Sequence, residues 1–335
     1  MRANGIAYNT GFLSPTQPLD LDRVRRELAI IRDDLHCNAV HLVGGDAGRI
    51  EAAARIAADL GLEVWFSPYP IGLDPEQIRA LFLDCADRAE RLRATGAEVV
   101  LVTGVELTLM NRGFIDGETL DDRLAQLFAG RVAEARTRLD GFLREAVAAV
   151  RGRFHGRVTY AAIPFEDVDW ELFDIVTLEL IRNAEVAGQF REAVRGLTAQ
   201  GKPVAITGFG TTTWRGSADV APRSMEIVEH DPVTGAPMRI SGLYERDEEG
   251  QAAYHREMLD IFDSEGVDSA FVYLFALDDY PHRPGGDPRD DLDLASPGIV
   301  KVLDGRSGDT YPGLPWEPKA AFAAIARHYA GTGAG

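Results

Sequence analysis

The 335-residue sequence has few of the features that mark a secreted, membrane-bound or redox protein. It contains two cysteines, Cys37 and Cys85, whose spacing fits no metal motif, so we expect buried free thiols rather than a disulfide. No apolar run reaches about 18 residues, and the amino-terminal segment lacks the charged-then-apolar order of a signal peptide. These absences predict a soluble protein of the cytoplasm.

Positive charge is also scarce, because 35 basic residues face 53 acidic ones and leave a net charge of −18. A surface of this sign repels phosphate groups, so nucleic acids and anionic membranes are not expected partners. A small molecule is the expected ligand. The sequence leaves the oligomeric state open between a monomer and a homodimer.

Motifs of several common enzyme classes are missing. No G-x-G-x-x-G follows the first strand-like run, and no G-x-S-x-G marks a serine nucleophile. The acidic run from Asp287 to Asp293 lacks the order of a calcium loop, and His255 and His282 have no partner at ligand spacing. We therefore expect neither a cofactor nor a metal ion.

What the sequence does contain is a regular alternation of apolar strand-like runs and helical patterns. The predicted strands are Gly5 to Asn9, Ala39 to Val43, Leu62 to Phe66, Val99 to Thr103, Arg157 to Ile163, Asp174 to Leu180, a run beginning at Val204, and Ser269 to Phe275. Near-continuous apolar strands are typical of a parallel sheet covered on both faces. Eight of them predict an α/β fold, a single (β/α)8 TIM barrel over residues 1–335, with an open doubly wound sheet as the rival.

Two long segments interrupt the alternation. Residues 218–242 contain three prolines and a predicted hairpin around the turn DPVTG, and residues 278–315 are rich in proline, glycine and aspartate. Long loops in compact domains are commonly lids or binding loops. Both segments follow predicted strands, so we expect them at the carboxyl end of the barrel, where such enzymes have their active sites.

The stretch from Pro203 to Ser217 ends a buried strand in glycines, threonines, a tryptophan and an arginine. Gly208 and Gly210 permit close approach of a ligand, and Trp214 and Arg215 supply an aromatic plane and a cation. An active-site rim and an ordinary glycine-rich strand exit both fit this stretch.

Carboxylates, aromatic rings and amides follow the other predicted strands and suggest a sugar-like ligand, because sugars stack on rings and pair with carboxylates. The candidate catalytic residues are Glu106, Glu166 and Glu179. The candidate substrate-binding residues are Tyr8, Asn9, His41, Trp65, Tyr69, Asn111, Trp170, Arg182, Trp214, Arg215, Tyr273 and Asp278. Glycoside cleavage needs two carboxyl groups, one protonated and one ionised, and each acid taken alone also fits a structural salt bridge.

The segments ELTLMNRGF (106–114), PVAITGFGTTTWRG (203–216), DLDLASPGIVKVL (291–303) and YPGLPWEPKAAF (311–322) resemble glycoside-hydrolase-like barrels of the retaining superfamily. The resemblance is closest to actinobacterial proteins labelled as abortive-infection proteins. It implies an acid/base after the fourth strand, here Glu106, and a nucleophilic glutamate after the seventh. That second position holds Gly208, within Thr207-Gly208-Phe209-Gly210, and Val105 precedes Glu106 where the relatives have asparagine.

These observations leave two main hypotheses. The first is an enzyme acting on a sugar-like or polyoxygenated natural-product substrate, with Glu106 as general acid and Glu166 or Glu179 as second carboxylate. It would act by single displacement, or as a lyase or cyclase, without a nucleophile on the seventh strand. The alternative is a degenerate barrel, a pseudo-glycosidase that binds a glycoside or polyketide-like ligand without chemistry. A scaffold role in phage defence ranks third.

Overall fold

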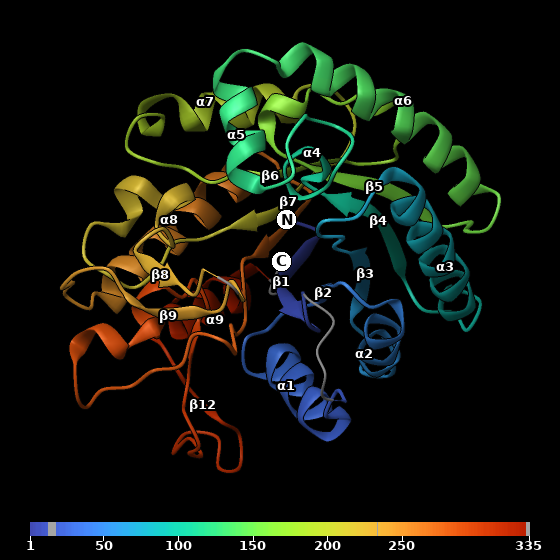
Figure 1. Ribbon diagram of the computed structural model, residues 1–335. Helices are drawn as coiled ribbons and strands as arrows, with labels where there is room; N and C mark the ends of the chain where they lie inside the picture. The colour runs from blue at the N-terminus through green and yellow to red at the C-terminus, as the bar shows by residue number, and fades with distance from the viewer. Residues whose placement is uncertain (13–17, 233, 333–335) are drawn as a thin grey trace.

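The chain folds into a closed barrel of eight parallel strands surrounded by helices (Figure 1). The computed structural model describes residues 1–12, 18–232 and 234–332. The strands follow the order β1-β10-β7-β6-β5-β4-β3-β2, and β1 pairs with both β2 and β10 to close the ring. The predicted (β/α)8 barrel is therefore confirmed, and the open sheet is excluded.

The element bounds lie within a few residues of the predicted ones. The barrel strands are β1 (Ala3–Asn9), β2 (Ala39–Gly44), β3 (Glu63–Pro68), β4 (Val99–Val105), β5 (Arg157–Ala162), β6 (Val176–Glu179), β7 (Val204–Phe209) and β10 (Ser269–Val272). The α-helices are α1 (Leu21–Asp33), α2 (Ala47–Asp59), α3 (Pro75–Arg93), α4 (Leu107–Met110), α5 (Leu120–Phe128), α6 (Val132–Arg151), α7 (Ala187–Thr198), α8 (Glu248–Ser264) and α9 (Ala320–Thr332).

Local sequence signals explain where the helices begin and break. Asp74 and Gln77 form a reciprocal capping box at the start of α3, where Pro75 occupies the first turn. The helical stretch after β4 breaks at Gly130, between α5 and α6, because this residue has a φ of +86° that glycine adopts without strain. The connection from β5 to β6 consists of two single-turn helices, η1 (Pro164–Glu166) and η2 (Trp170–Leu172).

Large rings and small residues fill the middle of the barrel. The rings of Trp65 and Phe271 lie 4.7 Å apart, and both side chains are fully buried. Gly5 makes room for them, since a Cβ at this position would lie 2.3 Å from the ring of Phe271. Side chains therefore close the barrel at this level, and a ligand can only enter from an end.

The two long segments pack against each other beyond the carboxyl ends of β7 and β10. The first contains the predicted hairpin, an antiparallel pair of β8 (Val228–His230) and β9 (Pro237–Ile240); residue 233 of the turn lies outside the described residues. The second includes the short strand β11 (Val300–Val302), which pairs antiparallel with β12 (Trp316–Pro318), directly after the segment. Apolar side chains of both segments form one cluster, which includes Ile227, Ile240, Leu292 and Leu294.

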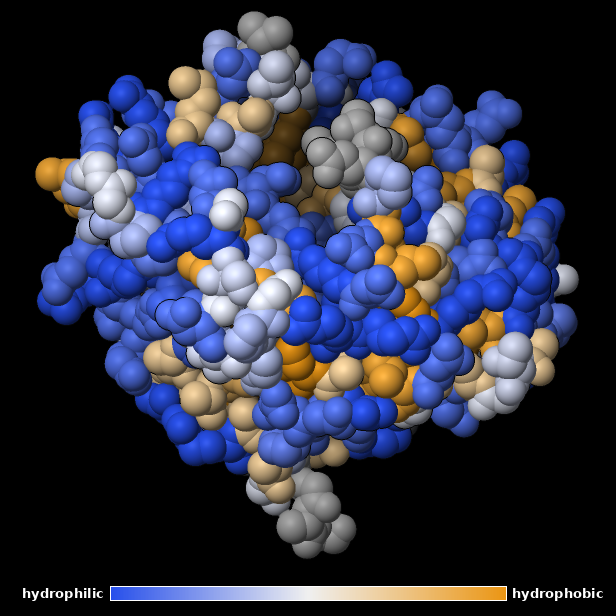
Figure 2. Space-filling model, turned by 90° about the horizontal axis from the view of Figure 1, so that it is seen from below, coloured by the Kyte–Doolittle hydropathy of each residue, from blue (hydrophilic) through white to orange (hydrophobic). Residues whose placement is uncertain are grey.

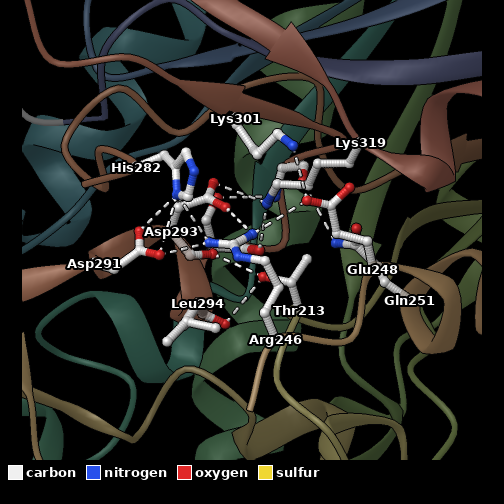
Figure 3. A network of polar contacts seen from close by, with 12 residues as sticks. Thr213, Arg246, Glu248, Gln251, His282, Asp291, Asp293, Leu294, Lys301 and Lys319 are labelled. Carbon is white, nitrogen blue, oxygen red and sulfur yellow. Dashed lines mark hydrogen bonds and ion pairs between the residues drawn. The ribbon is translucent and has the colours of Figure 1, made fainter. Parts of the chain in front are cut away.

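A buried polar network joins the second segment to α8 and to the loop after β7 (Figure 3). Arg246 contacts Asp291 at 2.9 Å and Asp293 at 2.8 Å, and Lys319 contacts Asp293 at 2.9 Å. The hydroxyl of Thr213 donates to the backbone carbonyl of Asp293. Because the charges are paired, the network fixes the segment over the barrel without leaving a buried ion unmatched.

Cys37 and Cys85 are free and buried, as predicted. Within the described ranges, no helix has both the length and the apolar character needed to cross a bilayer. The face shown in Figure 2 is largely hydrophilic and has a recess in its upper part with hydrophobic surface in its depth.

Candidate active site

Glu106 directly follows β4 and has a left-handed backbone, with φ 46° and ψ 43°. Its backbone N–H donates to the carbonyl of Ala161 on β5, and Gly104, at φ +90°, turns the chain just before it. A non-glycine residue in this region of φ/ψ space is uncommon and is found more often at functional sites. The turn places the Glu106 carboxyl at the carboxyl end of the barrel.

The environment of Glu106 favours its protonated form. Burial, together with the negative charges of Glu179 and Glu166, raises the pKa of Glu106 to about 8. The described residues supply no hydrogen-bond donor or cation that would favour the ionised form. A carboxyl with this pKa carries its proton at neutral pH and can donate it.

Glu179 is the last residue of β6 and pairs in register with Gly208 on β7. Its carboxyl lies directly over that glycine: a Cβ on residue 208 would lie 1.5 Å from Glu179 Oε2 and 2.6 Å from its carboxyl carbon. The hydroxyl of Thr207 donates to Glu179 Oε1 at 2.6 Å. Burial raises the pKa of Glu179 to about 7, and the Thr207 hydrogen bond opposes this shift by stabilising the ionised form.

Glu166 is held by four hydrogen-bond donors and is 1% exposed. The backbone N–H and hydroxyl of Thr108 contact Oε1 at 3.2 and 2.7 Å, the N–H of Ile163 contacts Oε2 at 3.1 Å, and the Tyr160 hydroxyl reaches both oxygens at 2.9 Å. Burial raises the pKa of Glu166 to about 7 against these bonds. Glu166 Oε1 accepts hydrogen bonds from Thr108, two residues after Glu106, so Glu166 stabilises the turn that positions Glu106.

Two tyrosines share the electrostatic field of these acids. Burial and the charges of Glu106, Glu179 and Glu166 raise the pKa of Tyr69, and burial with Glu179 and Glu106 raises that of Tyr273. Both side chains are half-buried. The structure thus brings Glu106, Glu179, Tyr69 and Tyr273 together from four strand ends, and both phenols stay neutral donors.

Three other predicted residues lie close to the ends or interior of the barrel. Asn9 ends β1 and accepts the N–H of Gly11, which shapes the turn after the strand. His41 lies inside the barrel, 5.7 Å from the ring of Phe271, where burial lowers its pKa to about 3 and keeps it neutral. Trp214 is half-buried, donates its indole N–H to Ser224 and contacts Tyr244 in the first long segment.

For three predicted substrate-binding residues the structure requires a correction, because they are buried in structural contacts. Tyr8 points outward and donates to Glu27 on α1 at 2.5 Å, since neighbouring residues of a strand face opposite sides. Trp65 is sealed inside the barrel and donates to Glu63. Asn111 bridges two loops by donating to Pro70 and accepting from Leu73.

Four further predictions of substrate-binding residues are corrected, because these residues make structural contacts away from Glu106 and Glu179. The carbonyl of Trp170 accepts from Lys202, which precedes β7, so Trp170 lies toward the amino end of the barrel. Arg182 pairs with Glu257 at 2.5 Å and lies over the ring of Tyr254, both on α8. Arg215 forms an exposed pair with Glu245. Asp278 pairs with Arg23 on α1 at 2.8 Å.

Two residues of the site were not predicted. Thr207 holds Glu179, and Tyr160 links Glu166 to the backbone N–H of Leu107. Both lie on barrel strands near the carboxyl end. The signal for Thr207 was its place directly before Gly208, but only the fold shows that β6 delivers a carboxyl to it.

Glu106 and Glu179 lie close enough for their charges to interact, and their pKa values are raised to about 8 and about 7. Pairs of carboxyls with separated pKa values are suited to general acid and base chemistry. Across the residues that the structure describes, no group of three or more His, Cys, Asp or Glu is placed to hold a metal ion. The carboxyls of Glu106 and Glu179 and the phenols of Tyr69 and Tyr273 can transfer protons and form hydrogen bonds.

Solved structures with the same fold include β-mannanases and a β-glucuronidase. A GH113 β-1,4-mannanase is 16% identical, with 98% of each chain covered and a TM-score of 0.60. The GH113 β-mannanase AaManA from Alicyclobacillus acidocaldarius, in complex with ManMIm, is 15% identical over 98% of this chain and 97% of its own, at a TM-score of 0.60. The β-glucuronidase of Parabacteroides merdae is 12% identical, with 97% of this chain but 36% of that chain covered, at a TM-score of 0.60.

At these identities the likeness is one of fold, a glycoside-hydrolase-like TIM barrel. No protein-family model matches the chain, and no curated protein matches it. None of the relatives named above is an abortive-infection protein, so that part of the resemblance stays a prediction.

Proposed function

We propose that this protein hydrolyses a glycosidic bond in a sugar-like or polyoxygenated substrate, with Glu106 as general acid and Glu179 as the second carboxylate. One observation carries the proposal: Glu106 and Glu179 lie at the carboxyl end of the barrel, close enough for their charges to interact, and their pKa values are raised to about 8 and about 7. At a pH between these values, Glu106 is mostly protonated and Glu179 is mostly ionised. Glycoside cleavage requires such a pair.

The roles follow from the hydrogen bonds. Glu179 accepts a hydrogen bond from the Thr207 hydroxyl, which stabilises the ionised carboxylate. The negative charges of Glu179 and Glu166 instead favour the protonated form of Glu106. Glu106 is therefore the donor and Glu179 the acceptor. Glu166 is removed from the choice of second carboxylate, because four donors already occupy its oxygens.

In the proposed step, Glu106 gives its proton to the glycosidic oxygen as the bond from that oxygen to the anomeric carbon breaks. A water oxygen bonds to the anomeric carbon, and Glu179 takes the proton that this water loses. The products are two free hydroxyls. Glu106 ends ionised and Glu179 ends protonated, and exchange with solvent restores both.

Single displacement is favoured because Glu179 lies flat against the β7 backbone, with one oxygen over Gly208 and the other on Thr207. We assign the attacking oxygen to a water molecule held by this carboxylate, because both of its oxygens are turned toward β7. Inverting enzymes separate their carboxyls by about 6.5–9.5 Å for this purpose, against about 5–5.5 Å in retaining ones.

The substrate class follows from the pocket and from the fold relatives. Tyr69 and Tyr273 present ring surface and neutral hydroxyls beside the two acids, as sugar recognition requires. The fold relatives include β-mannanases and a β-glucuronidase. We therefore propose a β-linked glycoside as the first class to test.

The test is a panel of aryl β-glycosides and manno-oligosaccharides assayed with the unmodified protein and with Glu106→Gln, Glu179→Gln and Glu171→Gln. The first two changes are expected to lower kcat by about 10²- to 10⁴-fold, the range for loss of an acid or base. Glu171 is the control, since its side chain is 88% exposed. Saturable ligand binding without turnover would instead support the pseudo-glycosidase alternative.

A further inference from the structure

The carboxyl of Glu179 fills the space that a side chain on residue 208 would otherwise take. The two residues are direct partners in the β6–β7 ladder. A Cβ on residue 208 would lie 2.6 Å from the carboxyl carbon of Glu179. The carboxyl carbon of a glutamate lies about 2.5 Å from its own Cβ by standard bond lengths, so Glu179 delivers its carboxyl at the distance that a glutamate on β7 would.

We propose that Thr207 and Gly208 of β7 form a seat that positions the Glu179 carboxylate, and that this carboxylate can be supplied from either of the two paired strands. The proposal rests on the proposed function only in calling the carboxylate catalytic. Gly208 is required because any side chain at this position would occupy the place of the Glu179 carboxylate. Thr207 is a positioning residue that acts through its hydrogen bond to Glu179.

The Gly208 half of the seat is a matter of space. The nearest atom to a Cβ on residue 208 would be Glu179 Oε2 at 1.5 Å, far inside van der Waals contact. Even alanine would therefore force the carboxyl away from β7 and from the Thr207 hydroxyl. No other atom group of the barrel is among the three nearest to this position, so the collision concerns Glu179 alone.

The Thr207 half is a matter of charge. The ionisable groups around Glu179 are Glu106, Tyr69 and Tyr273, with Glu166 behind Glu106 and the neutral His41 near the Thr207 backbone. None of them is a cation. The hydroxyl of Thr207 is thus the one hydrogen-bond donor to Glu179 among the described residues, and it favours the ionised form.

The first experiment moves the carboxylate between the strands. Gly208→Glu and Glu179→Gly are each expected to lower kcat by about 10²-fold or more, the first because two side chains collide and the second because the carboxylate is gone. The double variant, Glu179→Gly with Gly208→Glu, is expected to recover at least about tenfold over Glu179→Gly, which is roughly 1.4 kcal/mol of transition-state stabilisation. A double variant that folds, by circular dichroism, but is no more active than Glu179→Gly overturns the exchange.

Gly208→Ala tests the space directly. Its kcat is expected to fall about as far as that of Glu179→Gln, and the matched control Gly188→Ala is expected to leave kcat unchanged. Gly188 lies in α7, and a Cβ there would have no heavy atom within 4 Å. Full activity in Gly208→Ala would show that the Glu179 carboxylate does not need the space left by the missing side chain of residue 208.

The last experiment does not depend on any substrate. Carbon-13 NMR of labelled glutamate carboxyls, with Glu179 assigned through Glu179→Gln, gives its pKa in the unmodified protein, Thr207→Val and Thr207→Ser. The pKa of Glu179 is expected to rise in Thr207→Val and to return in Thr207→Ser. If these shifts occur and no glycoside is hydrolysed, the proposed function fails and the seat stands; if the pKa is the same in all three proteins, the seat is wrong whatever the activity.

Discussion

The hydroxyl of Tyr160 donates to both carboxylate oxygens of Glu166 at 2.9 Å and accepts the backbone N–H of Leu107 at 2.9 Å. Leu107 directly follows Glu106, so this phenol ties the left-handed turn of Glu106 to a buried acid on the next connection. Tyr160 and Glu166 therefore position the proposed general acid, Glu106, through the backbone that follows it, and neither needs to contact the substrate.

Removing the phenol oxygen should loosen this turn. Tyr160→Phe leaves the N–H of Leu107 and the Glu166 carboxylate short of a partner in a buried site, which costs about 1–3 kcal/mol of stability. We expect a lower free energy of unfolding in urea and a reduced kcat with little change in KM. Phe154→Leu changes a buried apolar residue that is not part of the site, so it is the control for a loss of stability alone. A normal kcat in Tyr160→Phe would contradict the support role.

The pH dependence of activity should be narrow. Glu179 must be ionised, so activity falls as the pH drops through its pKa of about 7; Glu106 must be protonated, so activity falls as the pH rises through its pKa of about 8. A bell-shaped profile of kcat/KM with its maximum between these values is expected, since kcat/KM reports groups of the free enzyme.

The two limbs can be assigned separately by substitution. Thr207→Val should move the acidic limb to higher pH and leave the basic limb in place, because its hydrogen bond reaches Glu179 and not Glu106. Glu106→Gln should remove the basic limb from the residual activity. A profile that stays flat from pH 6 to 9 in the unmodified protein would rule out both assignments.

The sequence predicted the fold well because its apolar runs are long and regular. Eight such runs predict a parallel sheet covered by helices and favour closure, and the pairing of β1 with both β2 and β10 decides between the barrel and the open sheet. The same logic placed Glu106, Glu179, Tyr69 and Tyr273, since the carboxyl ends of parallel strands meet at one edge. Short-range information was sufficient for these residues.

The predictions that needed correction depend on information that the local sequence does not contain. Tyr8 and Asn9 were both assigned to the site, yet a strand turns neighbours to opposite faces, and only the register decides which one enters. Asp278 pairs with Arg23, 255 positions away, and Trp170 lies on a connection that has already returned toward the other end of the barrel. Partners this distant in sequence become visible only in the fold.

The buried pair of Lys319 and Asp293 should be a strong determinant of stability. Their side chains are 0% and 1% exposed and meet at 2.9 Å, within the network that fixes residues 278–315. Lys319→Met leaves the buried Asp293 carboxylate with Arg246, at 2.8 Å, as its remaining cation among the described residues, so the loss should fall below the about 3–5 kcal/mol expected for a buried ion left without a partner. The double variant Lys319→Met with Asp293→Leu should recover part of that loss, because it removes both charges. Urea unfolding measures each value, and equal stability of the unmodified protein and Lys319→Met would contradict the pairing.

A fluorinated-sugar trap tests how Glu179 acts. A 2-deoxy-2-fluoro glycoside with a good leaving group accumulates a covalent adduct on a carboxylate that attacks the anomeric carbon, whereas an enzyme that activates water accumulates none. Residue 208 is glycine and Glu179 lies flat on β7, so the intact mass of the unmodified protein should not change by mass spectrometry. An adduct on Glu179 of the unmodified protein would show that this residue attacks the sugar directly, and the single-displacement step would have to be replaced by a double displacement in which Glu106 first donates and then removes a proton.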